Sequence, residues 1–266
     1  MRALLIVVTA CMAAATLACG QTPPPATTLP PGYLTEQTAP DAALILPPPA
    51  EGGDAADRAF YQSTRSLAGT PRWALATSDA NATIPGMYDH FACSLGVRLT
   101  PQVAPRLTLL LRRLARDSSL ATNHAKHVFL RPRPFALLGG TICIPHDTSL
   151  DTSTDYPSGH ATFSWSIGLI LAEIAPDRAT PILTRARAFG EGRAICGVHF
   201  ASAIGAGRTT GAALVAAEHG SAEFRADLEA VRQELAQLRA DPARQLPDAV
   251  ACRVEADLIS HPPFAG

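Results

Sequence analysis

The stretch DYPSGHATFSWSIGL (Asp155–Leu169) changes character halfway through. Pro157, Ser158 and Gly159 form a turn signal, and an apolar segment of helical composition follows His160 directly. If Ser158 caps this helix, the amides of Ser158, Gly159 and His160 lie unpaired at the positive end of the helix dipole. Such an end binds anions, and His160 would stand beside the bound group. The same pattern also fits an ordinary capped helix with a surface histidine.

Helical patterns continue on both sides of this stretch. Leu107, Leu110, Leu111 and Leu114 recur at helical spacing, and alternation of β-branched residues is nearly absent. We therefore expect a compact, all-α, multi-helix domain. The expected helices cover residues 55–67, 71–80, 85–95, 101–117, 119–129, 160–174, 178–196, 201–218 and 221–240. Residues 139–156 have loop composition, and so long a loop inside a compact domain tends to be functional.

Composition sets the outer limits on organisation and partners. The chain has 266 residues, 47% of them hydrophobic, and a net charge of −1, which gives no overall field favouring nucleic acid or an acidic membrane. Residues 1–20 read as a signal peptide, with lipid attachment at Cys19 as the alternative, so we expect a periplasmic or secreted protein. A Pro-rich arm (21–50), the helical domain (51–245) and a C-terminal tail (246–266) follow. No later segment is apolar enough over ~18 residues to span a membrane.

The remaining cysteines fit an oxidising compartment. Removal of the signal peptide leaves Cys93, Cys143, Cys196 and Cys252, an even number for which three pairings are possible. No Cys-x-x-Cys spacing suggests zinc. We expect one or two structural disulfides.

Two cations stand close together in AKHVFLRPRPF (Ala125–Phe135). Pro132 disfavours the helical conformation at Arg131, so the helix that carries Lys126 should stop just before it and leave Arg133 in an extended segment. Lys126 and Arg133 would then meet from different backbone elements. Solvated surface charge is the alternative interpretation.

A third cluster lies in GEGRAICGVHFASAIGAGR (Gly190–Arg208). Arg193 and His199 are six residues apart, which on one continuous helix places them on different faces. Gly197 offers an exit from the first helix, so Arg193 can end one helix while His199 precedes the next. Both side chains can then face one cavity.

Together the three clusters suit a phosphate dianion. Lys126, Arg133 and Arg193 can neutralise its oxygens, and arginine suits bidentate contact. One of the two histidines can attack phosphorus while the other protonates the leaving group. No set of carboxylates for magnesium or a two-metal site accompanies them, so we expect no metal and no cofactor.

At this point the chain closely resembles the bacterial class A non-specific acid phosphatases of the type 2 phosphatidic acid phosphatase and vanadium haloperoxidase superfamily. Their signature is Lys-x6-Arg-Pro, Pro-Ser-Gly-His and Ser-Arg-x5-His-x3-Asp. This sequence has Lys126–Arg133–Pro134 and Pro157–Ser158–Gly159–His160 intact, then Gly192–Arg193, His199 and Ala203. The segments LPPPA, DRAFYQSTR, FACSLG and RAICGVH also look like this family.

The resemblance implies the all-helical fold of that superfamily and an exported, metal-independent acid phosphatase that hydrolyses small phosphate monoesters through a phosphohistidine. Carried over by position, His199 is the nucleophile and His160 the general acid. The residues that would hold the phosphoryl group are Lys126, Arg133, Ser158, Gly159 and Arg193. A homodimer is compatible with the resemblance.

Two positions depart from the signature. Gly192 replaces a serine, and Ala203 replaces an aspartate that could fix the tautomer of His199. We therefore expect an impaired catalyst that keeps phosphate binding, unless Ser202, a backbone carbonyl or water takes over. The alternatives are a phosphate-binding relative without activity and, with less support, a vanadate-dependent peroxidase. An Ala203→Asp variant should regain rate if the missing carboxylate limits the enzyme.

Overall fold

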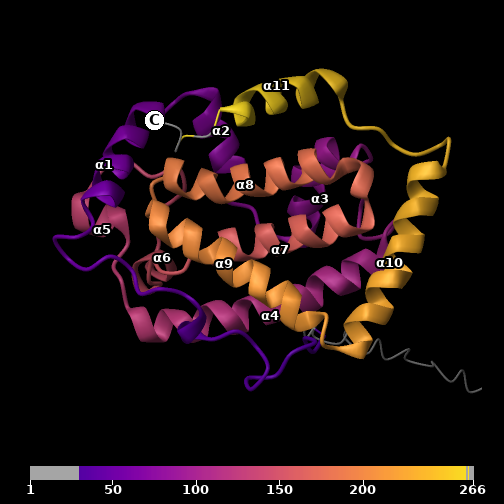
Figure 1. Cartoon of the computed structure of the whole chain (residues 1–266). Helices are drawn as coiled ribbons and strands as arrows, with labels where there is room; N and C mark the ends of the chain where they lie inside the picture. Colours follow the sequence, from indigo (N-terminus) through magenta and orange to yellow (C-terminus); the bar gives the residue numbers. More distant parts are fainter. Residues whose placement is uncertain (1–29, 262, 264–266) are drawn as a thin grey trace, which may run out of the picture.

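A computed structural model describes residues 30–261 and 263, which form one helical assembly without β-strands in that part of the chain (Figure 1). The signal peptide expected over residues 1–20 lies outside the described residues. The α-helices are α1 (Ala55–Thr64), α2 (Pro71–Ser78), α3 (Ile84–Leu95), α4 (Pro105–Phe129), α5 (Pro134–Leu138), α6 (Thr148–Thr152), α7 (Gly159–Ile174), α8 (Ala179–Ile195), α9 (Ala201–Glu218), α10 (Ala222–Ala240) and α11 (Ala249–Ser260). The expected all-α fold is confirmed.

Helix α7 is the centre of the molecule and packs against α8, α9 and α4 (Figure 1). Its buried residues lie on most of its circumference, as expected for a helix that is enclosed by others. Helix α9 approaches it closely because Gly207 and Gly211 lack side chains. A Cβ atom at Gly207 would lie 2.6 Å from the carbonyl oxygen of Ser158, and one at Gly211 would lie 2.7 Å from that of Thr162. The two glycines therefore fix α9 against the start of α7.

Helix α4 is longer than the sequence pattern predicted. The expected break near residue 118 is absent, and one helix runs over 25 residues. Leu107, Leu110, Leu111 and Leu114 are all buried in the main core, as their spacing indicated. The helix ends at Phe129, and Leu130 takes a left-handed backbone conformation. Lys126 thus lies in the last turn of α4, just before the Arg131–Arg133 segment.

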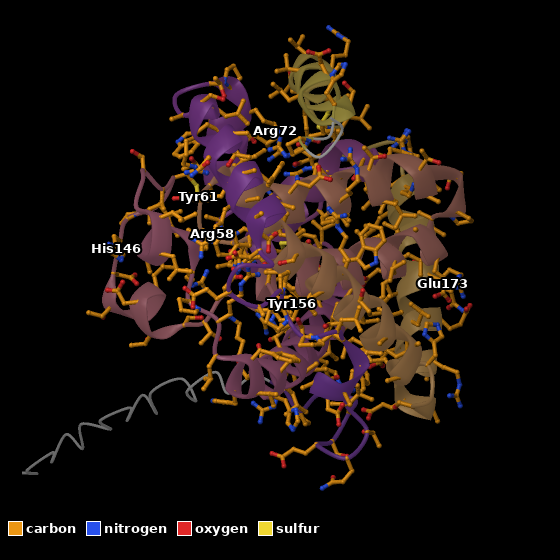
Figure 2. The ribbon with its side chains drawn as sticks, turned by 60° about the vertical axis from the view of Figure 1, so that its left-hand side comes forward. Arg58, Tyr61, Arg72, His146, Tyr156 and Glu173 are labelled. Atoms are coloured by element: carbon orange, nitrogen blue, oxygen red, sulfur yellow. A yellow bond between two sulfur atoms is a disulfide. The ribbon has the colours of Figure 1, made fainter. Side chains whose placement is uncertain are left out.

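The predicted loop and the predicted tail both contain helix. Helices α5 and α6 flank the segment 139–147, which Tyr61 of α1 holds through a 2.5 Å hydrogen bond to the carbonyl oxygen of Gly139 (Figure 2). Residues 246–266, expected as a tail, include α11. Within α11, Glu255 pairs with the buried Arg185 of α8 at 3.2 Å.

The four expected cysteines form two disulfides. Cys93–Cys252 joins α3 to α11, and Cys143–Cys196 joins the segment 139–147 to the end of α8. The second bridge is reinforced by a 3.0 Å hydrogen bond from the Cys143 amide to the Cys196 carbonyl. It holds the backbone three residues before His199.

The described part of the Pro-rich arm, residues 30–50, lies on the domain. Asp117 of α4 accepts a 2.7 Å hydrogen bond from the amide of Tyr33, and Ile45 is buried beside Tyr156. Tyr156 in turn donates to the carbonyl oxygen of Leu46 at 2.7 Å (Figure 2). The arm therefore reaches the residue that precedes the Pro157–His160 motif.

Candidate active site

The predicted residues lie at or next to the ends of helices α4, α5, α7, α8 and α9. Lys126 is in the last turn of α4 and Arg133 in the extended residue before α5. Ser158, Gly159 and His160 begin α7, Arg193 is in the last turn of α8, and His199 lies between α8 and α9. The chain exits α8 through Gly197, whose φ of 86° is accessible at little cost only to glycine. The exit expected at Gly197 is therefore present.

Lys126 and Arg133 meet at one serine, as the proline-biased segment between them predicted. Nζ of Lys126 lies 3.4 Å from Oγ of Ser153, and Nη2 of Arg133 lies 3.1 Å from the same oxygen. Burial, followed by the charge of Arg133, lowers the pKa of Lys126 to about 8. Two partly desolvated cations side by side repel one another, and a bound anion would offset that repulsion.

Arg193 supplies the most direct sign of an anion site. Its side chain is buried, and neither Nε nor Nη1 has a hydrogen-bond partner among the described residues. Burial and then the charge of Arg133 lower its pKa to about 10. An unpaired buried guanidinium is costly, so its presence indicates a ligand with acceptor oxygens.

His199 is held from both ring nitrogens. Nη1 of Arg133, which can only donate, lies 3.0 Å from Nε2 of His199. Nδ1 lies 3.0 Å from Oδ1 of Asp155 and therefore carries the proton. Burial and then Arg133, Lys126 and Arg193 lower the pKa of His199 well below its ordinary value. The ring is thus neutral, with the Nε2 lone pair directed toward the cationic side chains.

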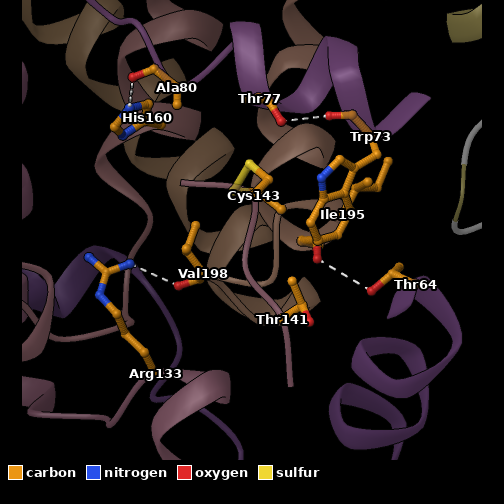
Figure 3. Close-up of a disulfide and its surroundings, with 12 residues drawn as sticks. Thr64, Trp73, Thr77, Ala80, Arg133, Thr141, Cys143, His160, Ile195 and Val198 are labelled. Carbon is orange, nitrogen blue, oxygen red and sulfur yellow. Dashed lines mark hydrogen bonds between the residues drawn. A yellow bond between two sulfur atoms is a disulfide. The ribbon is translucent and has the colours of Figure 1, made fainter. Parts of the chain in front are cut away.

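His160 is oriented by the connection between α2 and α3. Its Nε2 donates a 3.2 Å hydrogen bond to the carbonyl oxygen of Ala80 (Figure 3). Its ring stacks on Phe189. Burial and then Arg193, with smaller effects of Arg133 and Lys126, lower the pKa of His160 to about 3. The same cations therefore act on both histidines.

The start of α7 differs from the expectation in one respect. The amide of Ser158 is not free, because it donates to the carbonyl oxygen of Ala203 at 3.0 Å. The hydroxyl of Ser158 accepts from the amide of Ala161 at 3.4 Å, as the predicted N-cap requires. Ser158 thus stabilises the turn through its own hydrogen bonds. The amides of Gly159 and His160 lie in the first turn of α7 and have no helical carbonyl oxygen before them to bind.

The two departures from the signature each have a structural explanation. At Gly192, an added Cβ would lie 3.3 Å from Oδ2 of Asp79 and 3.5 Å from Cα of Ala76, so α2 packs closely there. Ala203 is fully buried in an apolar cluster with Ile45, Ala125, Tyr156 and Ala206. The carboxylate that contacts His199 comes instead from Asp155.

Sequence reasoning missed Asp155 together with the two residues that hold it. Arg131 lies 3.4 Å from Oδ2 of Asp155 and 2.8 Å from Oδ2 of Asp57 in α1. All three side chains are buried. The sequence did contain a signal for this role. Position 203 lacks the aspartate of the signature, and Asp155 lies two residues before Pro157 in the motif quoted above.

Comparison with known proteins identifies the family of the chain. Residues 107–225 match the model of the PAP2 superfamily. The chain is 39% identical over 219 residues to "Acid phosphatase" of Zymomonas mobilis, covering 81% of this chain and 82% of that protein. It is 35% identical to "Non-specific acid phosphatase" of Providencia stuartii (78% and 86% covered) and 33% identical to that of Salmonella typhimurium (73% and 80% covered).

The fold and these similarities define a helical phosphatase of the PAP2 superfamily. Within that superfamily, the chain belongs to the non-specific acid phosphatases. The predicted resemblance is therefore confirmed. In the described residues no helix combines the length and apolar character that a bilayer crossing needs.

Proposed function

We propose that this protein is an exported, metal-independent acid phosphatase that hydrolyses small phosphate monoesters through a phosphohistidine at His199. The observation that carries the proposal is the unpaired, buried guanidinium of Arg193 beside a neutral His199 and two further cations. Lys126, Arg133 and Arg193 would repel a divalent cation from the place where the phosphate binds. Two disulfides support export, because such bonds persist in oxidising compartments.

In the first step, the lone pair of Nε2 of His199 attacks phosphorus and the ester P–O bond breaks. The phosphate oxygens draw the hydrogen bonds of Arg133 away from Nε2. The leaving oxygen takes a proton from His160, which is in its imidazolium form in the complex because the bound dianion offsets Arg193, Arg133 and Lys126 and raises its pKa. Since Nε2 of His160 holds its proton against Ala80, Nδ1 is the nitrogen that remains for this transfer.

In the second step, water attacks phosphorus and the N–P bond breaks, which returns the electron pair to Nε2 of His199. His160 accepts the proton from the attacking water, so the starting protonation state is restored. Gly159 lets the phosphoryl group approach the first-turn amides of α7 without obstruction by a side chain. Ser158 contributes by holding the turn.

The expectation of an impaired enzyme remains untested. The reason for it was the absence of a carboxylate at position 203, and Asp155 supplies a carboxylate to His199 from another segment. The argument for a phosphate-binding relative without activity rested on Ala203, and the contact of Asp155 with His199 weakens that argument.

The test is release of phosphate from p-nitrophenyl phosphate at mildly acidic pH, with and without a chelator. We expect turnover that the chelator leaves unchanged and that vanadate inhibits. Rapid acid-free quenching with a 32P-labelled monoester should label wild type but not His199→Ala, whereas the exposed His127→Ala should behave as wild type. Loss of turnover on chelation, or equal labelling of His199→Ala, would contradict the proposal.

A further inference from the structure

We propose that Asp155 is the positioning residue for His199, and that Asp57 and Arg131 hold its carboxylate in place. This inference rests on the proposed phosphatase function and extends it. In the family signature the orienting carboxylate lies one helical turn after His199, whereas in this protein it lies in the turn before α7. The two segments are 44 residues apart along the chain.

The contact between the two residues is specific in its atoms. Oδ1 of Asp155 lies 3.0 Å from Nδ1 of His199 and 3.1 Å from the amide nitrogen of Phe200. One oxygen therefore fixes both the imidazole and the backbone that follows it. Arg133 donates to the opposite nitrogen, Nε2, at 3.0 Å. The two contacts select the same tautomer, with the proton on Nδ1 and the lone pair on Nε2.

The other oxygen of Asp155 faces an ion-pair network. Oδ2 has no hydrogen-bond partner among the described residues and lies at ion-pair distance, 3.4 Å, from Nη1 of Arg131. The amide of Asp155 donates to the carbonyl of Arg131 at 2.7 Å. Nη2 of Arg131 binds Asp57 at 2.8 Å, and the guanidinium lies over the ring of Phe200 at 4.3 Å. Three contacts, with the Asp155 amide, Asp57 and the Phe200 ring, therefore hold Arg131 in position beside the Asp155 carboxylate.

Asp57 joins this ion-pair network to the start of α9. Its Oδ1 accepts from the amide of Ser202 at 2.9 Å, and its Oδ2 accepts from the Ser202 hydroxyl. Nη1 of Arg131 also donates to Oγ of Ser202 at 2.7 Å. The start of α9 and the turn before α7 are thus joined through one arginine, with His199 and Phe200 between them.

The surroundings of Asp155 act on the pKa of its carboxyl in opposite directions. It is completely buried, and burial raises the pKa of its carboxyl to about 7. The groups that oppose this shift are Arg131, the Phe200 amide, Arg133 and Lys126. Oδ1 accepts N–H groups of both His199 and Phe200, which favours the carboxylate over the acid. A cation that forms on His199 during attack would lie 3.0 Å from this oxygen, so it lowers the pKa of Asp155 further and is stabilised by the carboxylate.

Position 203 cannot fill this role in the present structure. Ala203 has an apolar environment, and its carbonyl accepts from the Ser158 amide at 3.0 Å. Tyr156, the residue directly after Asp155, packs in the same cluster as Ala203. The alanine at 203 therefore leaves space for the segment that brings Asp155 to His199.

The test is Asp155→Asn in the full chain, measured beside wild type and the control Asp151→Asn. Asp151 is an exposed acid four residues earlier, outside this network. We expect kcat of Asp155→Asn to fall by about 10²- to 10⁴-fold with KM nearly unchanged, by analogy with amide replacement in serine-protease triads. The acidic limb of kcat/KM should move to lower pH, because the imidazolium loses its anionic partner.

Asp57→Asn should give a smaller loss of kcat and the same direction of pH change. A purely structural role for Asp155 would instead lower the thermal midpoint without moving the pH profile. That outcome, or a kcat of Asp155→Asn within about threefold of wild type, would overturn the inference while leaving the proposed function intact.

A second readout does not depend on turnover. Ring 15N chemical shifts of histidine-labelled protein should show His199 as the Nδ1–H tautomer in wild type and a mixture of tautomers in Asp155→Ala. An Nε2–H tautomer in wild type would refute the role of Asp155 even if the enzyme is active. An inactive wild type with the expected tautomer would refute the proposed function alone.

Discussion

Nε2 of His160 and the carbonyl oxygen of Ala80 are 3.2 Å apart, and this contact joins the start of α7 to the connection between α2 and α3 (Figure 3). Asp79, next to Ala80, is completely buried and pairs with Arg185 of α8 at 2.5 Å. Arg185 also binds Glu255 of α11 at 3.2 Å. The acceptor that orients His160 is therefore anchored to two helices outside the site.

The first prediction concerns the proton on His160. Because burial and Arg193 lower its pKa to about 3, His160 is neutral in the empty site at pH 5.5. A bound dianion offsets the nearby cations and raises that pKa, so binding should take up a proton. Calorimetry of sulfate binding in two buffers with different ionisation enthalpies measures this uptake. Sulfate is suitable because it stays a dianion at this pH.

The matched comparison for that experiment is His160→Gln. The variant should bind sulfate with markedly less proton uptake than wild type. Equal uptake in the two proteins would mean that another group takes the proton and that His160 stays neutral in the complex.

The second prediction concerns Arg193, two of whose buried nitrogens have no hydrogen-bond partner within the described part of the chain. Arg193→Met should weaken phosphate binding by about 10- to 100-fold or more, because a charge-assisted contact is worth roughly 1.5–3 kcal/mol. In the absence of phosphate it should raise the free energy of unfolding, since an unpaired cation no longer has to be buried. Inhibition constants for phosphate and thermal midpoints with and without phosphate measure both effects.

Arg131→Met is the contrasting variant. Arg131 is equally buried but pairs with Asp57 at 2.8 Å, so its loss leaves buried carboxylates without a counter-ion. We expect a destabilisation of roughly 3–5 kcal/mol. A lower midpoint for phosphate-free Arg193→Met would contradict the assignment of Arg193 as a strained, ligand-directed cation.

Local sequence patterns predicted much of the fold and the location of the site. Pro132 marked the end of α4 and the extended position of Arg133, and Gly197 marked the exit before His199. These signals act over a few residues and depend on backbone sterics. The merging of two expected helices into α4 could not be predicted in the same way, because tertiary packing of its leucines outweighs weak local breaks.

The role of Asp155 lay beyond such patterns. Its contacts with His199, Arg131 and, through Arg131, Asp57 connect segments that are distant in sequence. A single sequence carries no periodicity for such contacts. The family signature directed attention to position 203, where the structure has an apolar cluster.

The third prediction reverses the expectation for Ala203→Asp. A carboxylate at 203 would enter a fully buried apolar cluster next to the segment that carries Asp155. Burying a second acid there costs several kcal/mol unless it is neutralised, so we expect a lower thermal midpoint and no gain in kcat. Ala201→Asp, two residues earlier at a half-buried position, serves as the comparison. A rise in kcat for Ala203→Asp would show that Asp155 does not supply the orienting carboxylate.

The fourth prediction concerns a second buried acid pair, remote from the histidines. Glu218 at the end of α9 is buried, neither of its carboxyl oxygens has a hydrogen-bond partner of normal geometry among the described residues, and burial followed by the charge of Asp117 of α4 raises its pKa to about 9. Burial also raises the pKa of Asp117, but Asp117 accepts the amides of Tyr33 and Leu34 at 2.7 and 3.4 Å, and these contacts oppose the shift. Glu218 therefore holds the proton of the pair in the folded protein.

The sign of the resulting pH dependence follows from linkage. Above the unfolded-state pKa of Glu218, near 4.5, unfolding releases a proton that the folded protein keeps up to about pH 9. This contribution to stability is complete below pH 4.5 and is lost as pH rises through that window, by up to about 1.4 kcal/mol per pH unit. Glu218→Gln keeps the size and polarity of the side chain but cannot ionise. We expect its thermal midpoint to fall less than that of wild type between pH 5 and pH 8.5, with the exposed Glu51→Gln following wild type. Parallel curves for all three proteins would show that Glu218 is already ionised in the folded state.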